Sequence, residues 1–292
     1  MIMATMERVD LRRMTDRDLP AADELRRLAG WNQTLEDWRR LLWLEPGGCF
    51  VAVQEDGVVG TVTTTTYGRA LAWIGMMLVH PAHQRHGIGT HLMRHALDYL
   101  QSQEVSCVKL DATPAGRPVY GRLGFVPEGT LTRCQGPAVS RTQSPDCAAT
   151  GVRDLTDADW EAVDEIDQAA FGAPRSRLLH SLAQASRAVL VWPERGRVAG
   201  WGMLRPGVNA DYLGPLACSS VEGSSSLVAA LLGRAASHSV IWDVPDQNEP
   251  AKTTAQRFGF VPLRPLTRMC LGPNLVLGNP GAQFAIADPA GG

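Results

Sequence analysis

The segment Leu78-Val79-His80-Pro81-Ala82-His83-Gln84-Arg85-His86-Gly87-Ile88-Gly89-Thr90 joins an apolar run directly to a helical pattern. The run from Leu71 to Val79 is long enough for a buried strand, and apolar residues recur at helical spacing from Ile88 onward. A turn between a strand and a helix places unpaired main-chain N–H groups at the positive end of the helix. Gly87 and Gly89 carry no side chain that would keep a ligand away from these groups. The segment therefore predicts a diphosphate site.

Two common phosphate-binding motifs do not match this turn. A dinucleotide-binding fold needs G-x-G-x-x-G after a strand and an acidic residue about 20 positions further on. A nucleoside-triphosphate loop needs Gly-Lys followed by Ser or Thr. The turn here has the form Gln84-x-x-Gly87-x-Gly89. A two-glycine turn by itself is equally compatible with a simple connecting loop, so other motifs have to decide.

An internal repeat organises the chain. Five blocks of the first half return in the same order in the second half, at offsets between 132 and 141 residues. Conserved order with a slowly drifting offset indicates duplication with changes in loop length. The clearest pairs of blocks are Arg12-x-Met14-Thr15-Asp16-x-Asp18 with Arg153-x-Leu155-Thr156-Asp157-x-Asp159, Trp73-Ile74-Gly75 with Tyr212-Leu213-Gly214, Leu110-Asp111 with Trp242-Asp243, and Leu123-Gly124-Phe125-Val126-Pro127 with Phe258-Gly259-Phe260-Val261-Pro262.

Each repeat has the pattern of strands alternating with helices. In the first repeat we expect strands at about 49–54, 58–67, 71–79, 105–111 and from 125 onward. Helices are expected to begin at Thr15, Ile88 and Pro118. This is the pattern of an α/β layered fold used twice. The predicted organisation is a first domain at 8–135, a linker at 136–151, a second domain at 152–272, and a Gly/Pro/Ala-rich flexible tail at 273–292.

Composition excludes several classes of function. The chain has 292 residues, 45% of them hydrophobic, and a net charge of −2, so it can bury two cores and has no basic field for nucleic acid. Its six cysteines show no C-x-x-C spacing, which argues against a metal site and against disulfide chemistry. No stretch is apolar enough to span a membrane, and the first residues do not read as a signal peptide. We expect a soluble, cytoplasmic protein, either monomer or homodimer.

The turn and a second motif together resemble a known family. Leu78-Val79-His80-Pro81 followed by Gln84-x-x-Gly87-x-Gly89 resembles the coenzyme A loop of the GNAT superfamily of N-acetyltransferases. Tyr120-x-x-Leu123-Gly124-Phe125 resembles the closing motif of the same superfamily, and the resemblance covers roughly residues 8–135. It implies two tandem GNAT-like domains, each with a mixed, mostly antiparallel central sheet flanked by helices, and acetyl-CoA as the cofactor.

The resemblance also assigns roles to individual residues. It implies that the strands at 71–79 and 105–111 splay apart and hold the pantetheine arm of the cofactor between them. Tyr120 would protonate the departing thiolate, and the alternative for Tyr120 is a packing role. The implied cofactor-binding residues are Met77, Leu78, Val79, Gln84, Arg85, His86, Gly87, Ile88, Gly89 and Thr90.

The group that deprotonates the amine is left open. The buried strand carries no acid, although some members of the superfamily use a glutamate there. Asp111 at the end of the next strand is the best placed carboxylate, and the alternative is a turn-capping aspartate. Trp31 and Asn32 fall where the family folds two helices over the acceptor, so they are candidate substrate-binding residues, with ordinary packing as the alternative.

The second repeat is expected to lack the cofactor site. An offset of 139 places Gly223, Ser226 and Val228 opposite Gln84, Gly87 and Gly89, so the glycine pair is lost and Glu222 lies nearby. Counting back five residues from Phe260 gives Ala255 opposite Tyr120. We expect this half to be structural or substrate-facing, for example by completing a pseudo-twofold sheet contact with the first repeat.

The resulting hypothesis is an acetyl-CoA-dependent N-acetyltransferase. The amine of a small molecule would attack directly in a ternary complex, because no cysteine lies in a motif for an acyl-enzyme step. The alternative is a non-catalytic acyl-CoA sensor or small-molecule binding module. The sequence leaves open the identity of the amine and the length of the acyl chain.

Overall fold

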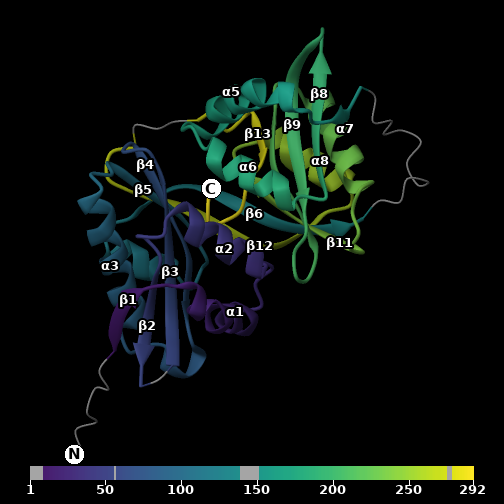
Figure 1. Cartoon of the computed structure of the whole chain (residues 1–292). Coiled ribbons are helices and arrows are strands. Elements are labelled where there is room, and N and C mark those ends of the chain that lie inside the picture. The colour runs from purple at the N-terminus through teal and green to yellow at the C-terminus, as the bar shows by residue number, and fades with distance from the viewer. Residues whose placement is uncertain (1–8, 56, 139–150, 275–277) are drawn as a thin grey trace, which may run out of the picture. The chain divides into compact units, whose positions relative to one another are not determined.

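The structure is a computed structural model, and it describes residues 9–55, 57–138, 151–274 and 278–292 (Figure 1). The chain divides into two compact units, residues 1–106 and residues 107–292. None of the helices in these described ranges combines the length and apolarity needed to cross a bilayer.

The first unit is an antiparallel sheet with helices packed on it. The strand order is β1-β2-β3-β4, and α1, α2 and α3 all pack against β3. Leu92 and Met93 of α3 are fully buried, as is Trp38 of α2. The elements are β1 (Asp10–Arg13), a 3₁₀ turn (Asp16–Asp18), α1 (Leu19–Leu28), α2 (Leu35–Leu44), β2 (Phe50–Gln54), β3 (Gly57–Tyr67), β4 (Leu71–Val79), a second 3₁₀ turn (Pro81–His83) and α3 (Ile88–Ser102).

A β-bulge interrupts β4 just before the glycine turn. Thr61 pairs with Leu78 and Thr63 pairs with Gly75, so one residue of β3 faces two residues of β4. Met76, one of those two, has a φ of 47°, and its carbonyl accepts a hydrogen bond of 2.8 Å from the Thr61 hydroxyl. A bulge bends its strand and changes the direction of the following main-chain groups. It therefore sets the orientation of the last three residues of β4.

The second unit holds the end of the first repeat and the whole second repeat. Its strand order is β5-β12-β6-β11-β10-β9-β8-β7, with β13 paired to β10; the β10–β11 pair is parallel and the others are antiparallel. The elements are β5 (Cys107–Ala112), α4 (Arg117–Arg122), β6 (Val126–Pro137), β7 (Arg153–Asp154), a 3₁₀ turn (Asp157–Asp159), α5 (Trp160–Phe171), α6 (Ser176–Ala185), β8 (Ala188–Glu194), β9 (Arg197–Arg205), β10 (Asp211–Cys218), α7 (Val221–Leu232), β11 (Ser239–Pro245), α8 (Glu249–Arg257), β12 (Val261–Leu271) and β13 (Gln283–Ala285).

The two repeats exchange their last strands. β6, which ends the first repeat, pairs with β11 of the second repeat, and β12, which ends the second repeat, pairs with β5 of the first. β6 and β12 also pair with each other and run side by side in Figure 1. The exchange explains why the compact units do not follow the repeats, since β5, α4 and β6 belong with the second half.

The exchange is held by two matching ion pairs. Arg268 of β12 donates to both oxygens of Asp111 in β5, at 2.9 and 3.0 Å. Arg133 of β6 donates to both oxygens of Asp243 in β11, at 2.8 and 2.6 Å. Each pair joins residues directly opposite each other in the register, and the carboxylate side chains are fully buried. The Leu110-Asp111 and Trp242-Asp243 blocks found in the sequence are therefore the two halves of this reciprocal contact.

The expected fold class is confirmed, and two of the expected boundaries need correction. The mixed, mostly antiparallel sheets flanked by helices are present, and the strands expected in the first repeat lie within a few residues of the observed ones. The tail expected to be flexible at 273–292 is instead ordered in its described part, residues 278–292: it includes β13, and Ala285, Ile286 and Ala287 are fully buried. The predicted linker begins too early, because Gly136 and Pro137 end β6; residues 139–150 lie outside the described ranges.

Candidate active site

The glycine turn forms as the sequence predicts and leaves a helix terminus uncapped. α3 begins at Ile88 after Gly87, whose left-handed conformation (φ 82°) serves as the N-cap without any side-chain hydrogen bond. The N–H groups in the first turn of a helix have no partner within the helix. In the described chain no other residue caps them, and the residues Gln84 to Gly87 are exposed. This is a row of N–H donors at the positive end of a 15-residue helix.

Gly89 lies in close contact with the end of β4. A Cβ at Gly89 would lie 3.0 Å from the Met77 Cε atom and 3.7 Å from the Val79 Cγ2 atom. The first turn of α3 therefore packs directly on the end of β4. Both segments assigned to the cofactor, Met77–Val79 and Gln84–Thr90, lie together in the first unit.

Side chains of the turn stabilise its shape. The Gln84 amide donates 3.1 Å to the Val79 carbonyl, and the Ala82 N–H donates 3.2 Å to His80 Nδ1. Arg85 has a φ of 66°, and the side chains of Arg85 and His86 are exposed. The Gln84 side chain thus bonds the turn to the end of β4, and Arg85 provides a positive charge within the turn.

The donors present fit a diphosphate group. The row of uncapped N–H groups, the close approach of α3 to β4 at Gly89, and the exposed guanidinium of Arg85 are all suited to an anion that carries a long substituent along β4. No acidic residue lies in the first turn of α3 to oppose such an anion.

Tyr120 lies in α4 of the second unit with an unengaged hydroxyl. Its ring makes an edge-to-face contact with Phe125 at 6.2 Å between centroids, and a Cβ at Gly116 would lie 2.9 Å from the ring. The hydroxyl forms no hydrogen bond within the described part of the chain. Burial raises the pKa of Tyr120 to about 12, so the phenol keeps its proton throughout the neutral range.

The Leu123-Gly124-Phe125 motif fixes where Tyr120 lies. α4 ends at Arg122, and Gly124 follows in the left-handed region with a φ of 92°. The Phe125 N–H returns to the Tyr120 carbonyl at 3.2 Å. In the second repeat, the Phe260 N–H bonds the Ala255 carbonyl at 2.9 Å, so Ala255 is the structural counterpart of Tyr120.

Asp111 is a buried ion-pair partner. Both of its oxygens accept hydrogen bonds from Arg268, and burial raises the pKa of Asp111 in spite of that positive charge. It does not cap the following turn, where Thr113 Oγ1 accepts from the Gly116 N–H at 3.2 Å. No local pattern could indicate Arg268 as its partner, because the two residues are 157 positions apart.

Trp31 and Asn32 lie in the connection between α1 and α2, as expected. The Trp31 carbonyl accepts a 3.0 Å hydrogen bond from Arg26, and Asn32 is buried. Several buried polar atoms just before α2, in α2 and on β3, against which α2 packs, have no hydrogen-bond partner in the described chain. They are Gln33 Oε1 before α2, Trp38 Nε1 in α2, and Thr63 Oγ1 and Thr65 Oγ1 on β3. Sequence reasoning missed the threonines, although the run Thr63-Thr64-Thr65-Thr66 within a buried strand was the available signal.

The second repeat closes its own helix terminus. Ser220 caps α7 by accepting a 3.1 Å hydrogen bond from the Gly223 N–H, and Glu222 lies in the first turn. A Cβ at Gly223 would lie 2.4 Å from Trp192, so this turn is packed rather than open. The correspondence of Gly223, Ser226 and Val228 with the first glycine turn is wrong: residues 80–87 separate β4 from α3, and residues 219–220 alone separate β10 from α7. The connection between strand and helix is therefore shorter in the second repeat than in the first.

Comparison with known proteins agrees with this geometry. Two family models match, both described as GNAT acetyltransferase, one at residues 13–125 and the other at residues 163–285. The Bacillus subtilis protein named uncharacterized N-acetyltransferase YitH is 25% identical over 236 residues, which cover 80% of each chain. A holothin acyltransferase from a Pseudoalteromonas species is 25% identical over 205 residues, 70% of this chain and 67% of that one.

Solved structures show the same fold. A putative acetyltransferase from Pyrococcus horikoshii superposes with a TM-score of 0.82 at 24% identity, covering 97% of this chain and 96% of the other. A tandem GNAT protein from the clavulanic acid biosynthesis pathway superposes with a TM-score of 0.67 at 15% identity, covering 91% and 100%. Enzymes of this family generally use an acyl-CoA. The chain is an acyltransferase of the GNAT family, with two GNAT domains in tandem.

Proposed function

We propose that the first repeat transfers an acetyl group from acetyl-CoA to the primary amine of a small molecule. The observation that carries the proposal is the uncapped N-terminus of α3, packed on β4 at Gly89. The same feature is closed in the second repeat by Ser220 and Trp192. The open turn therefore supports a cofactor site in the first repeat and not in the second.

Two segments of the first unit are proposed to hold the cofactor. The main-chain N–H groups from Arg85 to Thr90 bind the pyrophosphate, and the side chain of Arg85 adds charge. Main-chain groups of Met77, Leu78 and Val79 bind the pantetheine arm, in the direction set by the bulge at Met76. When bound, the thioester supplies an activated acyl group with a thiolate as leaving group.

Tyr120 is proposed as the proton donor to the leaving thiolate. Its raised pKa of about 12 keeps the phenol protonated at neutral pH, and its hydroxyl is not committed to another residue of the described chain. A positioned general acid contributes a factor of about 10² to 10⁴ to the rate.

Asp111 is proposed as the group that orients the ammonium or accepts its proton. Its buried carboxylate is already paired with Arg268, and the equivalent Asp243–Arg133 pair lies in the repeat without an open cofactor turn. Those contacts support the alternative that Asp111 is structural. The Asp111→Asn variant decides between the two roles when its turnover in the amine panel and its melting temperature are measured separately.

The acceptor is proposed to bind at the α1–α2 connection with Trp31 and Asn32. The unpartnered buried atoms of Gln33, Trp38, Thr63 and Thr65 support a polar ligand, since leaving such an atom unpaired costs about 1–3 kcal/mol. The relative named holothin acyltransferase supports a small molecule as the acceptor.

The test is an amine panel with the purified full chain. Acetyl-CoA, the chain and each amine are incubated together; thiol release is followed by colour and the product by mass. We expect an acetyl mass increase on at least one amine. Binding of CoA without transfer to any amine would support a sensor instead, and no binding of CoA would contradict the proposal altogether.

Substitution of Tyr120 by Phe tests the acid directly. We expect kcat to fall by roughly 100- to 10,000-fold while the Kd for CoA changes less than about twofold, because the ring remains and only the donated proton is lost. The matched control is Tyr99→Phe, which removes the hydroxyl that donates to Glu45 in the first unit. That control is expected to lower stability and leave kcat unchanged; unchanged turnover in Tyr120→Phe would remove Tyr120 from the mechanism.

A further inference from the structure

The second repeat contains the counterpart of the proposed pantetheine-binding strand end. The β9–β10 register shifts between Leu213 and Leu216, within one residue of the position where the β3–β4 register shifts between Gly75 and Leu78. Cys218 pairs with Gly200 as Val79 pairs with Gly60, and both residues end their strands. Leu216, Ala217 and Cys218 therefore correspond to Met77, Leu78 and Val79.

These three residues are already paired with another part of the chain. Leu216 pairs with Ala285 and Ala217 with Gln283 in an antiparallel ladder, and the Cys218 N–H donates 3.0 Å to the Ala282 carbonyl. The β10–β11 pairing stops earlier, at Leu213 opposite Trp242. Beyond the bulge, β10 thus turns from β11 to β13.

β13 also contacts β11, so it lies between the two strands. The Ile286 N–H donates 3.4 Å to the Asp243 carbonyl, and the Trp242 indole N–H donates 2.9 Å to the Phe284 carbonyl. Gln283 is 6% exposed, and Phe284 and Ala285 are buried. Phe284 and Ala255, the counterpart of Tyr120, belong to the same apolar cluster.

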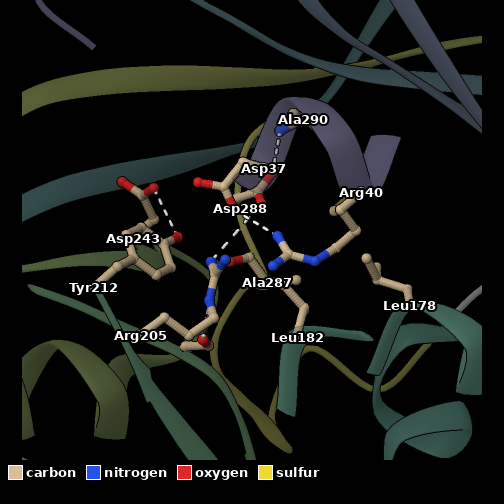
Figure 2. Close-up of polar contacts among 12 residues, drawn as sticks. Asp37, Arg40, Leu178, Leu182, Arg205, Tyr212, Asp243, Ala287, Asp288 and Ala290 are labelled. Atoms are coloured by element: carbon tan, nitrogen blue, oxygen red, sulfur yellow. Dashed lines mark hydrogen bonds and ion pairs between the residues drawn. The ribbon is translucent and has the colours of Figure 1, made fainter. Parts of the chain in front are cut away.

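The neighbouring residues are shaped for this segment. A Cβ at Gly214 would lie 2.2 Å from the Ile286 carbonyl oxygen, so the close approach requires glycine. Asn248 donates from Nδ2 to the carbonyls of Pro280, Gly281 and Gln283, at 3.2, 3.1 and 3.0 Å. Arg205 donates to both the Gly214 carbonyl and the Ala287 carbonyl, and Figure 2 shows its guanidinium against Ala287.

We propose that residues 282–287 permanently occupy the pantetheine slot of the second repeat, so that the full chain binds a single CoA. The inference rests on the proposed function of Met77–Val79 in the first repeat. The main chain of the segment forms the hydrogen bonds with residues 216–218 that the amides of a pantetheine arm would otherwise form. The self-capped N-terminus of α7 provides no pyrophosphate site beside that slot.

The experiment combines stoichiometry with hydrogen exchange on the full chain. Native mass spectrometry and calorimetry with CoA are expected to give one CoA per chain. Hydrogen-exchange mass spectrometry is expected to show that saturating CoA slows exchange in peptides covering 77–79 and 85–90. Peptides covering 216–218 and 282–287 should exchange slowly without CoA and be unchanged by it.

Asn248→Asp is the variant that loosens the segment. The aspartate keeps the oxygen that caps α8 at the Ala251 N–H, 3.0 Å away, and replaces the donor to three carbonyls by an acceptor. Exchange at 282–287 should accelerate at least tenfold, with the Kd for CoA unchanged. The control is Lys252→Gln, an exposed change in the same helix that should leave exchange at wild-type rates.

The outcomes separate the two proposals. Two CoA molecules per chain, or faster exchange at 282–287 when CoA is added, would overturn the inference and leave the proposed function standing. Absence of any CoA binding, with slow exchange at 282–287 retained, would overturn the proposed function while the segment still fills the second repeat. Fast exchange at 282–287 in the unliganded wild type would also overturn the inference.

Discussion

Asp18 shows how one side chain organises the start of a repeat. It accepts hydrogen bonds from both terminal nitrogens of Arg12, at 2.7 Å each, and from the N–H and hydroxyl of Thr15. Asp159 makes the same contacts with Arg153 and Thr156. These contacts explain why the Arg-x-x-Thr-x-x-Asp motif recurs in both halves. They stabilise a 3₁₀ turn just before the first helix of each repeat.

Replacing Asp18 by Asn should therefore destabilise the chain in a pH-dependent way. The Arg12 guanidinium holds the pKa of Asp18 at about 2, below its usual value, so the carboxylate stabilises the folded state above about pH 4 and loses that effect as the pH falls toward 2. At neutral pH we expect a loss of about 1–2 kcal/mol, reduced because Arg12 is half exposed.

Thermal unfolding from pH 2 to pH 7 provides the measurement. The difference between wild type and Asp18→Asn should shrink as the pH falls below about 4. The exposed Asp16 in the same turn supplies the control, because Asp16→Asn should differ little from wild type at any pH. A difference for Asp18→Asn that stays constant over the whole range would contradict this account.

Gly89 tests the close approach between α3 and β4. In Gly89→Ala the new methyl group would lie 3.0 Å from the Met77 Cε atom, at the strand end that we propose binds the pantetheine arm. We expect the Kd for CoA to rise roughly tenfold, which corresponds to about 1.4 kcal/mol. Stability should not fall, since replacing glycine by alanine within a helix stabilises the helix by about 1 kcal/mol.

Calorimetry and thermal unfolding of the same samples separate the two effects. Ser220→Ala is the matched control, because it removes the cap of the corresponding helix in the second repeat. It should lower stability by about 1 kcal/mol without changing the affinity for CoA. Wild-type affinity in Gly89→Ala would show that this turn does not hold the cofactor.

At the scale of the elements, local sequence patterns predict where helices and strands lie, but they do not predict which strands pair. The alternation and turn chemistry around 49–54, 71–79 and Ile88 predict strands and a helix close to the observed bounds, because each pattern reports local burial. The same patterns cannot reveal that β6 pairs with β11, since an exchanged strand has the same alternation as an unexchanged one. The pairing depends on contacts more than 100 residues apart, such as Arg133 with Asp243.

Two predictions were wrong for related reasons: that the tail is flexible, and that residues 223–228 of the second repeat correspond to the glycine turn of the first. The segment after Gly278 is rich in Gly, Pro and Ala, which is typical of flexible chain, yet Asn248 and the edge of β10 hold its main chain. A fixed offset of 139 cannot detect that the β10–α7 connection has lost residues. The glycine turn of the first repeat, where we propose that the cofactor binds, was predictable in its local structure because all its determinants lie within one short segment, Val79 to Thr90.

The ion pairs of the exchanged strands should be strongly coupled. Arg268→Met leaves the buried Asp111 carboxylate without its partner, and breaking a buried pair in this way costs about 3–5 kcal/mol. The double variant Arg268→Met with Asp111→Leu removes both charges and should be more stable than the single variant. Urea unfolding measures both, and a double variant less stable than Arg268→Met would contradict the pairing.

For the whole molecule, the exchange makes the two repeats interdependent. In the described part of the chain β12 covers one edge of β5 and one of β6, and β11 covers the other edge of β6, so a fragment of residues 8–138 leaves three strand edges open. We expect this fragment alone to be unfolded or aggregated by circular dichroism and gel filtration. Co-expression with residues 151–292 should restore a one-to-one complex, because the β6–β12 ladder needs no covalent link. A stable monomeric fragment 8–138 would contradict this expectation.

The same exchange constrains how the protein is made on the ribosome. β6 is complete at Pro137, but β12 does not begin until Val261, so the nascent chain carries an unsatisfied ladder through the synthesis of more than a hundred residues. During that interval, the Arg133 guanidinium and the main-chain groups of β6 must stay hydrated and apart from neighbouring nascent chains. Translation speed between these two codon positions, and the chaperones that reach the chain in that time, therefore govern how much of the protein is recovered folded.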